Sequence, residues 1–259
     1  MGRNIIDTKK TSKNIIRTED TSFKINNKDN DLTLISSSIN LSIHEDIFKK
    51  SPQKPTLLST KDNIFVYSVD IYQNYPVIKK LRAFIKHIYG KSGYVGFSDL
   101  CDLQYDYYSK WFYAENEKGE IQSTMRLVLK DKNNLLPIEM GIVDTEPKYR
   151  YVIDTKNKVA DINSFCFKRL NTIELLNSTI ASFCIENKIN TLYCMCDVLS
   201  SSINKLYRRI GCLESKTLIY PIYFPGYGKV INGELTPTKW NIMEIPLTQL
   251  KKIAAKASQ

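Results

Sequence analysis

Residues 159–196 read VADINSFCFKRLNTIELLNSTIASFCIENKINTLYCMC, and this stretch decides the fold. Its two ends, 159–167 and 191–196, are short runs of apolar and β-branched residues that predict strands. Between them, apolar residues recur at helical spacing, and Asn171 with Glu174 predicts a capping box at the start of a helix. A strand, a helix and a second strand in this order predict two parallel strands joined by a helical crossover.

Further elements are predicted on both sides of this unit. In chain order they are a strand at 64–69, a helix between Asn74 and Gly90, a β-hairpin with arms at 107–114 and 121–130, a helix at 203–210 closed by Gly211, strands near 217–224 and 239–245, and a helix from Leu247. This order predicts an α/β protein with three layers, α/β/α, in which helices cover both faces of a mixed central sheet.

The N-terminal part of the chain differs in composition from the rest. Residues 1–60 are rich in Lys, Asn, Asp, Ser and Thr and show no sustained hydrophobic period, so we expect a flexible polar extension. Residues 61–259 carry the strand and helix signals and are predicted to form one domain.

Composition excludes several classes of protein. With 42% hydrophobic residues among 259, the chain can bury a core and is not wholly disordered. No run approaches the roughly 20 apolar residues of a membrane span, and no secretory signal is visible, so a cytoplasmic protein is expected. The net charge of +10 is spread along the chain without a nucleic-acid recognition motif. This charge favours an acidic protein partner over nucleic acid.

The six cysteines lie among apolar neighbours and are interpreted as reduced core thiols. A zinc site built from Cys184, Cys194, Cys196 and Cys212 is the alternative, but the C-x-x-C spacing is missing, and no metal is expected. The chain has two histidines, so few residues could serve as the base of a mechanism that needs a histidine.

Polar residues interrupt two of the predicted strands. In the second arm of the hairpin, strand alternation places Arg126 on the more polar side. In the strand 159–167, Asp161 and Asn163 share one face. This polar pair stands out within an otherwise apolar strand.

Four short motifs resemble those of bacterial N-acyl amino acid synthases and acyl-homoserine-lactone (autoinducer) synthases, which share the GNAT fold of the acyl-CoA N-acyltransferases. The motifs are Leu81-Arg82, Tyr105-Asp106, Ser123-Thr124-Met125-Arg126-Leu127 and Asp161-Ile162-Asn163-Ser164-Phe165. The segment 204–212 also resembles a late helix of GNAT acyltransferases. The resemblance implies an acyltransferase that moves a fatty acyl group from a thioester to the amine of an amino acid or related small molecule.

The departures from the family pattern are informative. Asp161 stands where the family has Glu, Ser164 where it has Arg, and Asp102 and Asp106 are four residues apart instead of three. These changes disfavour a homoserine-lactone product, which stays as an alternative. A second alternative is a non-catalytic GNAT-fold binding module with a basic surface.

The glycine-rich loop that cradles the diphosphate of coenzyme A is absent, and residues 168–172 stand in its place. Acyl carrier protein presents acyl-phosphopantetheine without the nucleotide, so it is the expected donor, with acyl-CoA as the alternative. No permanently bound cofactor is implied. Lys168 and Arg169 are candidates to contact the acidic carrier, the alternative being a solvated loop.

The resemblance implies catalytic roles for three residues. Asp161 is the candidate base, or else caps a turn or pairs with Arg126. Arg126 is the candidate clamp for an acceptor carboxylate, or else forms a salt bridge to Asp106. Tyr207 is the third candidate, or else a buried structural ring.

The substrate-binding candidates are Arg82, Asp102, Asp106, Trp111 and Phe165. Arg82 either assists Arg126 or is a solvated helical side chain. Trp111 and Phe165, together with Phe112, line an acyl-chain channel or belong to the core. The two parallel strands should splay apart and expose backbone N–H groups for the pantetheine arm and the oxyanion.

Overall fold

The computed structural model describes residues 51–96 and 99–256, which form one mixed sheet with helices around it. The strands are β1 (Thr56–Lys61), β2 (Ile64–Val69), β3 (Tyr94–Val95), β4 (Ser109–Asn116), β5 (Ile121–Leu129), β6 (Ile142–Val143), β7 (Val159–Phe167), β8 (Thr191–Asp197), β9 (Leu213–Glu214), β10 (Ile222–Ile231) and β11 (Glu234–Pro246). The helices are α2 (Tyr75–Lys91), α3 (Asp99–Asp106), α4 (Pro137–Met140), α5 (Asn171–Glu186), α6 (Ser201–Arg209) and α7 (Leu247–Lys256). The strand order is β1-β2-β4-β5-β7-β8-β11-β10-β3, with β6 beside β10 and β9 beside β11.

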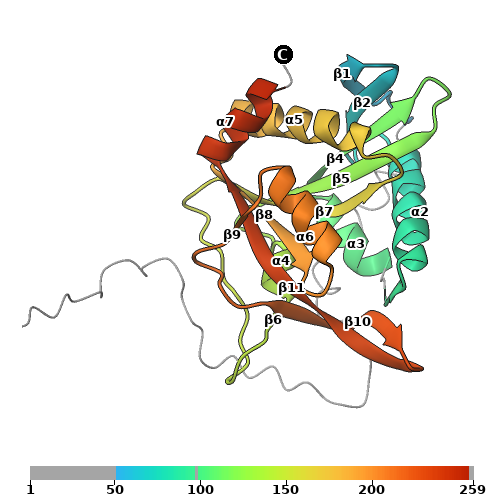
Figure 1. Ribbon diagram of the computed structural model, residues 1–259. Coiled ribbons are helices and arrows are strands. Elements are labelled where there is room, and N and C mark those ends of the chain that lie inside the picture. The colour runs from blue at the N-terminus through green and yellow to red at the C-terminus, as the bar shows by residue number, and fades with distance from the viewer. Residues whose placement is uncertain (1–50, 97–98, 257–259) are drawn as a thin grey trace, which may run out of the picture.

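Helices lie on both faces of this sheet (Figure 1). On one face, α5, α6 and α7 pack against a core that includes Met125 and Leu127. On the other face, α2 packs Leu81 against Trp111, and α4 contributes Ile138 to a second core. The predicted three-layer α/β arrangement is therefore confirmed.

β7 and β8 are the parallel pair among the described strands, and they part along their length. Residue pairs join them from Val159 opposite Thr191 to Ile162 opposite Cys194, and none joins them beyond that point. The register of β7 against β5 also shifts, and Ser164 has a φ of 54°. This β-bulge re-aims the side chains that follow it. The predicted splay between the two strands is confirmed.

The helix starts follow the sequence in one case and depart from it in another. Asn74 caps α2 as predicted, accepting a hydrogen bond from the N–H three residues on at 3.1 Å. The capping box predicted from Asn171 and Glu174 is wrong. Leu170 already has helical φ and ψ, so Asn171 lies inside the helix, and Glu174 pairs with Arg209 at 2.8 Å instead.

The ordered fold begins before the predicted boundary at residue 61. β1 runs from residue 56 and pairs with β2 in antiparallel fashion, so the last residues assigned to the polar extension are part of the sheet. Residues 1–50 of that extension lie outside the described range. Over residues 51–96 and 99–256, none of the helices has both the length and the apolar character that a membrane crossing requires.

Candidate active site

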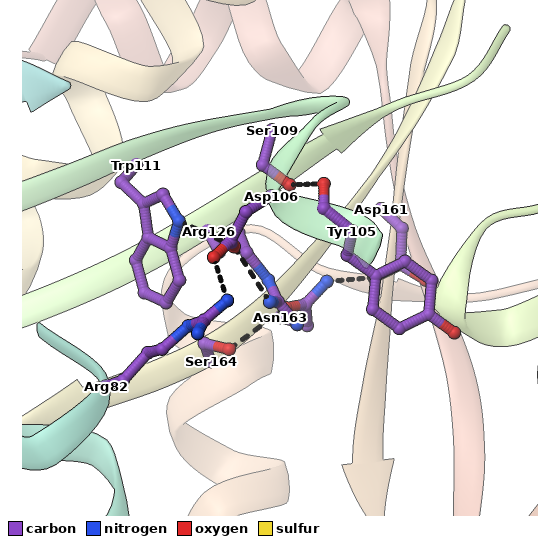
Figure 2. A network of polar contacts seen from close by, with 9 residues as sticks. All are labelled: Arg82, Tyr105, Asp106, Ser109, Trp111, Arg126, Asp161, Asn163 and Ser164. Atoms are coloured by element: carbon purple, nitrogen blue, oxygen red, sulfur yellow. Dashed lines mark hydrogen bonds and ion pairs between the residues drawn. The ribbon is translucent and has the colours of Figure 1, made fainter. Parts of the chain in front are cut away.

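A buried carboxylate at the end of α3 organises a cluster of charges on the α2 and α4 side of the sheet (Figure 2). Asp106 is fully buried and forms an ion pair with Arg82 from α2. It also accepts hydrogen bonds from Arg126 Nη1 at 3.2 Å and from Trp111 Nε1 at 3.0 Å. The salt bridge between Arg126 and Asp106 is thus formed, and the solvated alternative for Arg82 is wrong.

Arg126 comes from β5 and is held on several sides. Its guanidinium lies 5.3 Å from the centroid of the Tyr105 ring and 5.2 Å from that of the Trp111 ring. Nε donates a hydrogen bond to Asn163 Oδ1 at 2.7 Å. Arg126 is 3% exposed, so stacking and hydrogen bonds fix a buried positive charge beside β7.

Asn163 links Arg126 to Asp161 across the bulge of β7 (Figure 2). Its amide lies 3.4 Å from Asp161 Oδ1, and its Oδ1 also accepts from Ser164 Oγ at 3.0 Å. The structure therefore brings Asp161 and Arg126 into one network, as the sequence predicted. Asn163 was missing from the predicted site residues, although strand alternation had placed it on the same face as Asp161.

Asp161 has the proton affinity that a general base needs near neutral pH. Its carboxylate is fully buried and accepts a hydrogen bond from Ile138 N–H at 3.0 Å. Burial raises the pKa of Asp161 to about 7, against the opposing effect of hydrogen bonds from Ile138 and Asn163 and of the positive charge on Arg126. The nearby carboxylate of Glu139 raises the pKa further.

Glu139 fixes the segment that faces Asp161. Its buried carboxylate pairs with Lys130 Nζ at 2.6 Å and accepts from the N–H groups of Leu136 and Ile153, each at 2.7 Å. These contacts hold α4, whose Ile138 N–H points to Asp161. No sequence pattern singled out Glu139, because its role depends on three segments that meet only in the folded chain.

One donor of this cluster has no hydrogen-bond partner. Arg82 and Arg126 both pair with Asp106, and Asp161 titrates near neutral pH. Arg82 Nε is buried and has no hydrogen-bond partner. A ligand oxygen can therefore accept a hydrogen bond from this N–H.

The opposite face of the splay is filled with side chains. Tyr207 from α6 packs edge-on against Phe165, with ring centroids 5.7 Å apart. These rings and Cys194 surround a cavity of about 10 Å³, room for about one water molecule. Burial raises the pKa of the Tyr207 hydroxyl well above its usual value, and the ring belongs to the core.

The three aromatic residues predicted to line one channel lie on two faces of the sheet. Trp111 is buried beside Arg126, whereas Phe112 and Phe165 belong to the core under α5 and α6. Neighbouring residues of a strand point to opposite faces, and the bulge at Ser164 moves Phe165 to the face of Phe112. A single channel built from all three is therefore wrong.

The remaining predicted residues lie around the cluster. Asp102 is on α3, but its side chain lies outside the described part of the structure. Lys168 and Arg169 follow β7 and precede α5, at the edge where β7 and β8 end. The ammonium of Lys168 lies 5.4 Å from the centroid of the Phe84 ring, and Arg169 is exposed.

The described cysteines are free and buried. Cys194 and Cys212 approach to 3.6 Å between sulfur atoms, and burial raises the pKa of Cys184 and of Cys196 to about 12. Within residues 51–96 and 99–256, no three His, Cys, Asp or Glu side chains gather as a metal site would require. The thiols act there as apolar core groups.

Comparison with known structures identifies the architecture. FeeM, an N-acyl amino acid synthase from uncultured soil microbes, superposes with a TM-score of 0.50 at 11% identity, over 75% of this chain and 97% of FeeM. The chain has the GNAT fold. A GNAT family acetyltransferase from Elizabethkingia anophelis with acetyl-CoA bound matches with a TM-score of 0.44 at 13% identity, over 72% of this chain and all of that one. No protein-family model and no curated protein sequence matches the chain.

Proposed function

We propose that the chain is an N-acyltransferase that moves a fatty acyl group from acyl carrier protein to the amine of an amino acid or related small molecule. The observation that carries this proposal is the buried cluster on a GNAT fold, in which Asp161, with a pKa of about 7, lies in one network with Arg126. Attack of an amine on a thioester needs a proton acceptor of this strength at neutral pH.

The base is Asp161. An amine that attacks the thioester carbonyl forms its new C–N bond and must lose a proton, which passes to the Asp161 carboxylate directly or through water. The Ile138 N–H and the Asn163 amide orient that carboxylate. When the C–S bond breaks, the proton held by Asp161 passes to the departing thiolate of the carrier, so the carboxylate is restored as the amide and the thiol leave.

Arg82 and Arg126 favour an acceptor that carries a carboxylate. The buried Arg82 Nε has no hydrogen-bond partner, and the guanidinium groups of Arg82 and Arg126 lie together beside Asp106. The carboxylate of an amino acid supplies an acceptor oxygen for this N–H and pairs with a guanidinium group. This is the reason to prefer an amino acid over a simple amine.

The splay of β7 and β8 supports the thioester side of the proposal. β7 has no residue pairs with β8 beyond Ile162, so its backbone N–H groups on that side can meet a pantetheine arm or an oxyanion. Because Tyr207 and Phe165 fill this groove, an arm that enters here has to displace their rings. The carrier donor itself rests on the missing diphosphate loop, together with Lys168 and Arg169.

The test is to incubate the protein with acyl carrier proteins of several chain lengths and a pool of amino acids, and to search by mass spectrometry for acylated products. An N-acyl amino acid is expected, and D161N should lower kcat by about 10²–10⁴-fold. D154N, which changes a partly exposed loop carboxylate, is the control and should leave kcat unchanged.

The outcomes separate the alternatives. Consumption of S-adenosylmethionine with release of a lactone would replace the proposal by a homoserine-lactone synthase. Absence of product with every acceptor, beside a stable complex with a partner, would replace it by a binding module. Full activity of D161N would remove Asp161 as the base.

A further inference from the structure

A second polar site lies where β8 ends, away from the cluster around Asp106. Tyr94 of β3, Asp197 of β8, Tyr227 and Lys229 of β10 and Trp240 of β11 meet there, and we call these five residues the aromatic cage. Two cross-strand pairs build it, Asp197 opposite Trp240 and Tyr94 opposite Lys229. Four strands therefore converge on one point at the carboxyl end of a parallel strand, where α/β sheets commonly bind ligands.

The floor of the aromatic cage is an ionised carboxylate. Asp197 is 2% exposed, and its Oδ2 accepts hydrogen bonds from the Tyr94 hydroxyl at 2.5 Å and from Lys229 Nζ at 2.9 Å. Burial alone would raise the pKa of Asp197, but these two hydrogen bonds, with a further one from Leu199 N–H, bring it below the usual value. The carboxylate thus stays negative, and the ammonium of Lys229 balances its charge.

The walls of the aromatic cage are three stacked rings. The Tyr94 ring lies 6.0 Å from that of Tyr227 and 5.7 Å from that of Trp240, and these last two lie 5.9 Å apart. Lys229 Nζ lies 4.3 Å from the centroid of the Tyr94 ring. An ammonium above an aromatic face and beside a carboxylate is the arrangement by which proteins recognise organic cations.

One donor in the aromatic cage is unused. Trp240 Nε1 is buried and has no hydrogen-bond partner. A buried N–H without a partner costs free energy that a ligand oxygen would restore. Lys229 supplies an ammonium but no acceptor atom, so it satisfies Asp197 and leaves Trp240 unsatisfied.

We propose that the aromatic cage binds the primary ammonium group of a small organic amine that also carries a hydroxyl or carboxyl oxygen. The ammonium of Lys229 marks the position that this group takes beside Asp197 and Tyr94. The Lys229 side chain is about a third exposed and can withdraw into water, so a ligand that satisfies Trp240 as well competes with it.

This site is separate from the candidate base. Asp161 lies opposite Tyr193 in the pairing of β7 with β8, four residues before Asp197. At roughly 3.3 Å per residue, the backbone of Asp197 lies about 13 Å along β8 from the residue opposite Asp161. The proposed function places the amine of the acyl acceptor at Asp161, so a molecule in the aromatic cage is a second ligand, and its binding does not rest on the proposed function.

The test is a titration of the ¹⁵N-labelled full chain with ethanolamine, which carries an ammonium and a hydroxyl, followed by NMR of the indole N–H groups. The chain has two tryptophans. Trp111 Nε1 donates a hydrogen bond to Asp106, away from the aromatic cage, so the Trp111 signal is an internal reference. We expect a saturable shift of the Trp240 signal with no shift of the Trp111 signal. K229M should lower the apparent Kd about tenfold, because the internal competitor is gone.

Two variants test whether binding depends on the carboxylate of Asp197 and on the hydroxyl of Tyr94. D197N should abolish the shift, and Y94F, which keeps the ring but loses the hydroxyl, should weaken binding while an unchanged Trp111 signal reports an intact fold. A Trp240 signal that does not respond in K229M, or that responds equally in D197N, overturns the proposal.

A parallel acylation assay with acyl carrier protein, ethanolamine and the pool of amino acids distinguishes the two proposals. Binding at the aromatic cage without acylation of any acceptor supports the site and removes the acyltransferase. If D197N acylates acceptors as fast as the wild type does, and the Trp240 signal does not respond to ethanolamine, the proposed binding site is wrong. The proposed acyltransferase then remains.

Discussion

At the scale of single residues, Asp161 links the proposed chemistry to a cost in stability. Its pKa is about 7 in the folded chain and near 3.8 in the unfolded chain. Below pH 3.8 both states hold the proton, and above pH 7 neither does. Between these values the folded state binds more protons than the unfolded state, so stability falls as pH rises, by roughly 4 kcal/mol in all.

We therefore predict that D161N removes this slope. The free energy of unfolding of the wild type, measured with urea at several pH values from 4.5 to 8, should decline more steeply than that of D161N. The difference should grow in favour of the variant up to about pH 7 and then level off, because the Asn has no charge to bury. A difference that stays constant with pH would show that Asp161 is not protonated in the folded chain at acidic pH.

Strand alternation predicted some residues of the site, and the other residues could not be predicted from the sequence. Alternation put Arg126 on the polar side of its strand and Asp161 with Asn163 on one face, and the structure joins them in one network. The role of Glu139 could not be predicted from the sequence, because its three partners come from segments that show no local pattern. The unpartnered Arg82 Nε is likewise visible only once α2 packs beside Asp106.

At the scale of elements, two asparagines give opposite expectations for helix capping. Asn74 accepts a hydrogen bond at the start of α2, whereas no side chain caps α5 at Asn171. N74A should lower the free energy of unfolding by about 1 kcal/mol, because an N–H of the first turn loses its acceptor. N171A is the matched control and should change stability by less than about 0.5 kcal/mol. Equal losses in urea unfolding would contradict the assignment of the caps.

Periodicity predicted the helices and most of the strands, and it failed where backbone geometry depends on a neighbour. The bulge at Ser164 has no sequence signal, because a left-handed φ is most common at glycine, asparagine and aspartate. β1 was assigned to the polar extension, since an edge strand with exposed residues shows no buried face. The bulge matters for the site, because it turns Phe165 toward Tyr207.

At the scale of the whole molecule, the order of elements predicted the fold, and the distribution of charge bears on the proposed donor. The alternation of strands and helices predicted three layers, which the likeness to FeeM at 11% identity bears out. A net charge of +10 favours an acidic partner but does not say where that partner docks. The position of the basic residues relative to the splay of β7 and β8 indicates which of them we expect to contact that partner.

Two pairs of basic residues lie at opposite edges of the sheet. Lys168 and Arg169 lie at the edge where β7 and β8 end. Lys251 and Lys252 lie on α7, which begins at the other edge, because β11 ends there beside Thr191, the first residue of β8. If an acidic carrier delivers the thioester into the splay, the charge reversal K168E/R169E should raise KM for acyl carrier protein about tenfold or more. The same variant should leave kcat/KM for a small acyl-pantetheine thioester unchanged, and added salt should narrow its difference from the wild type. K251E/K252E makes the same change of charge at the far edge and is the control. Equal effects of the two double variants would show that net charge, and not a docking site beside the splay, governs use of the carrier.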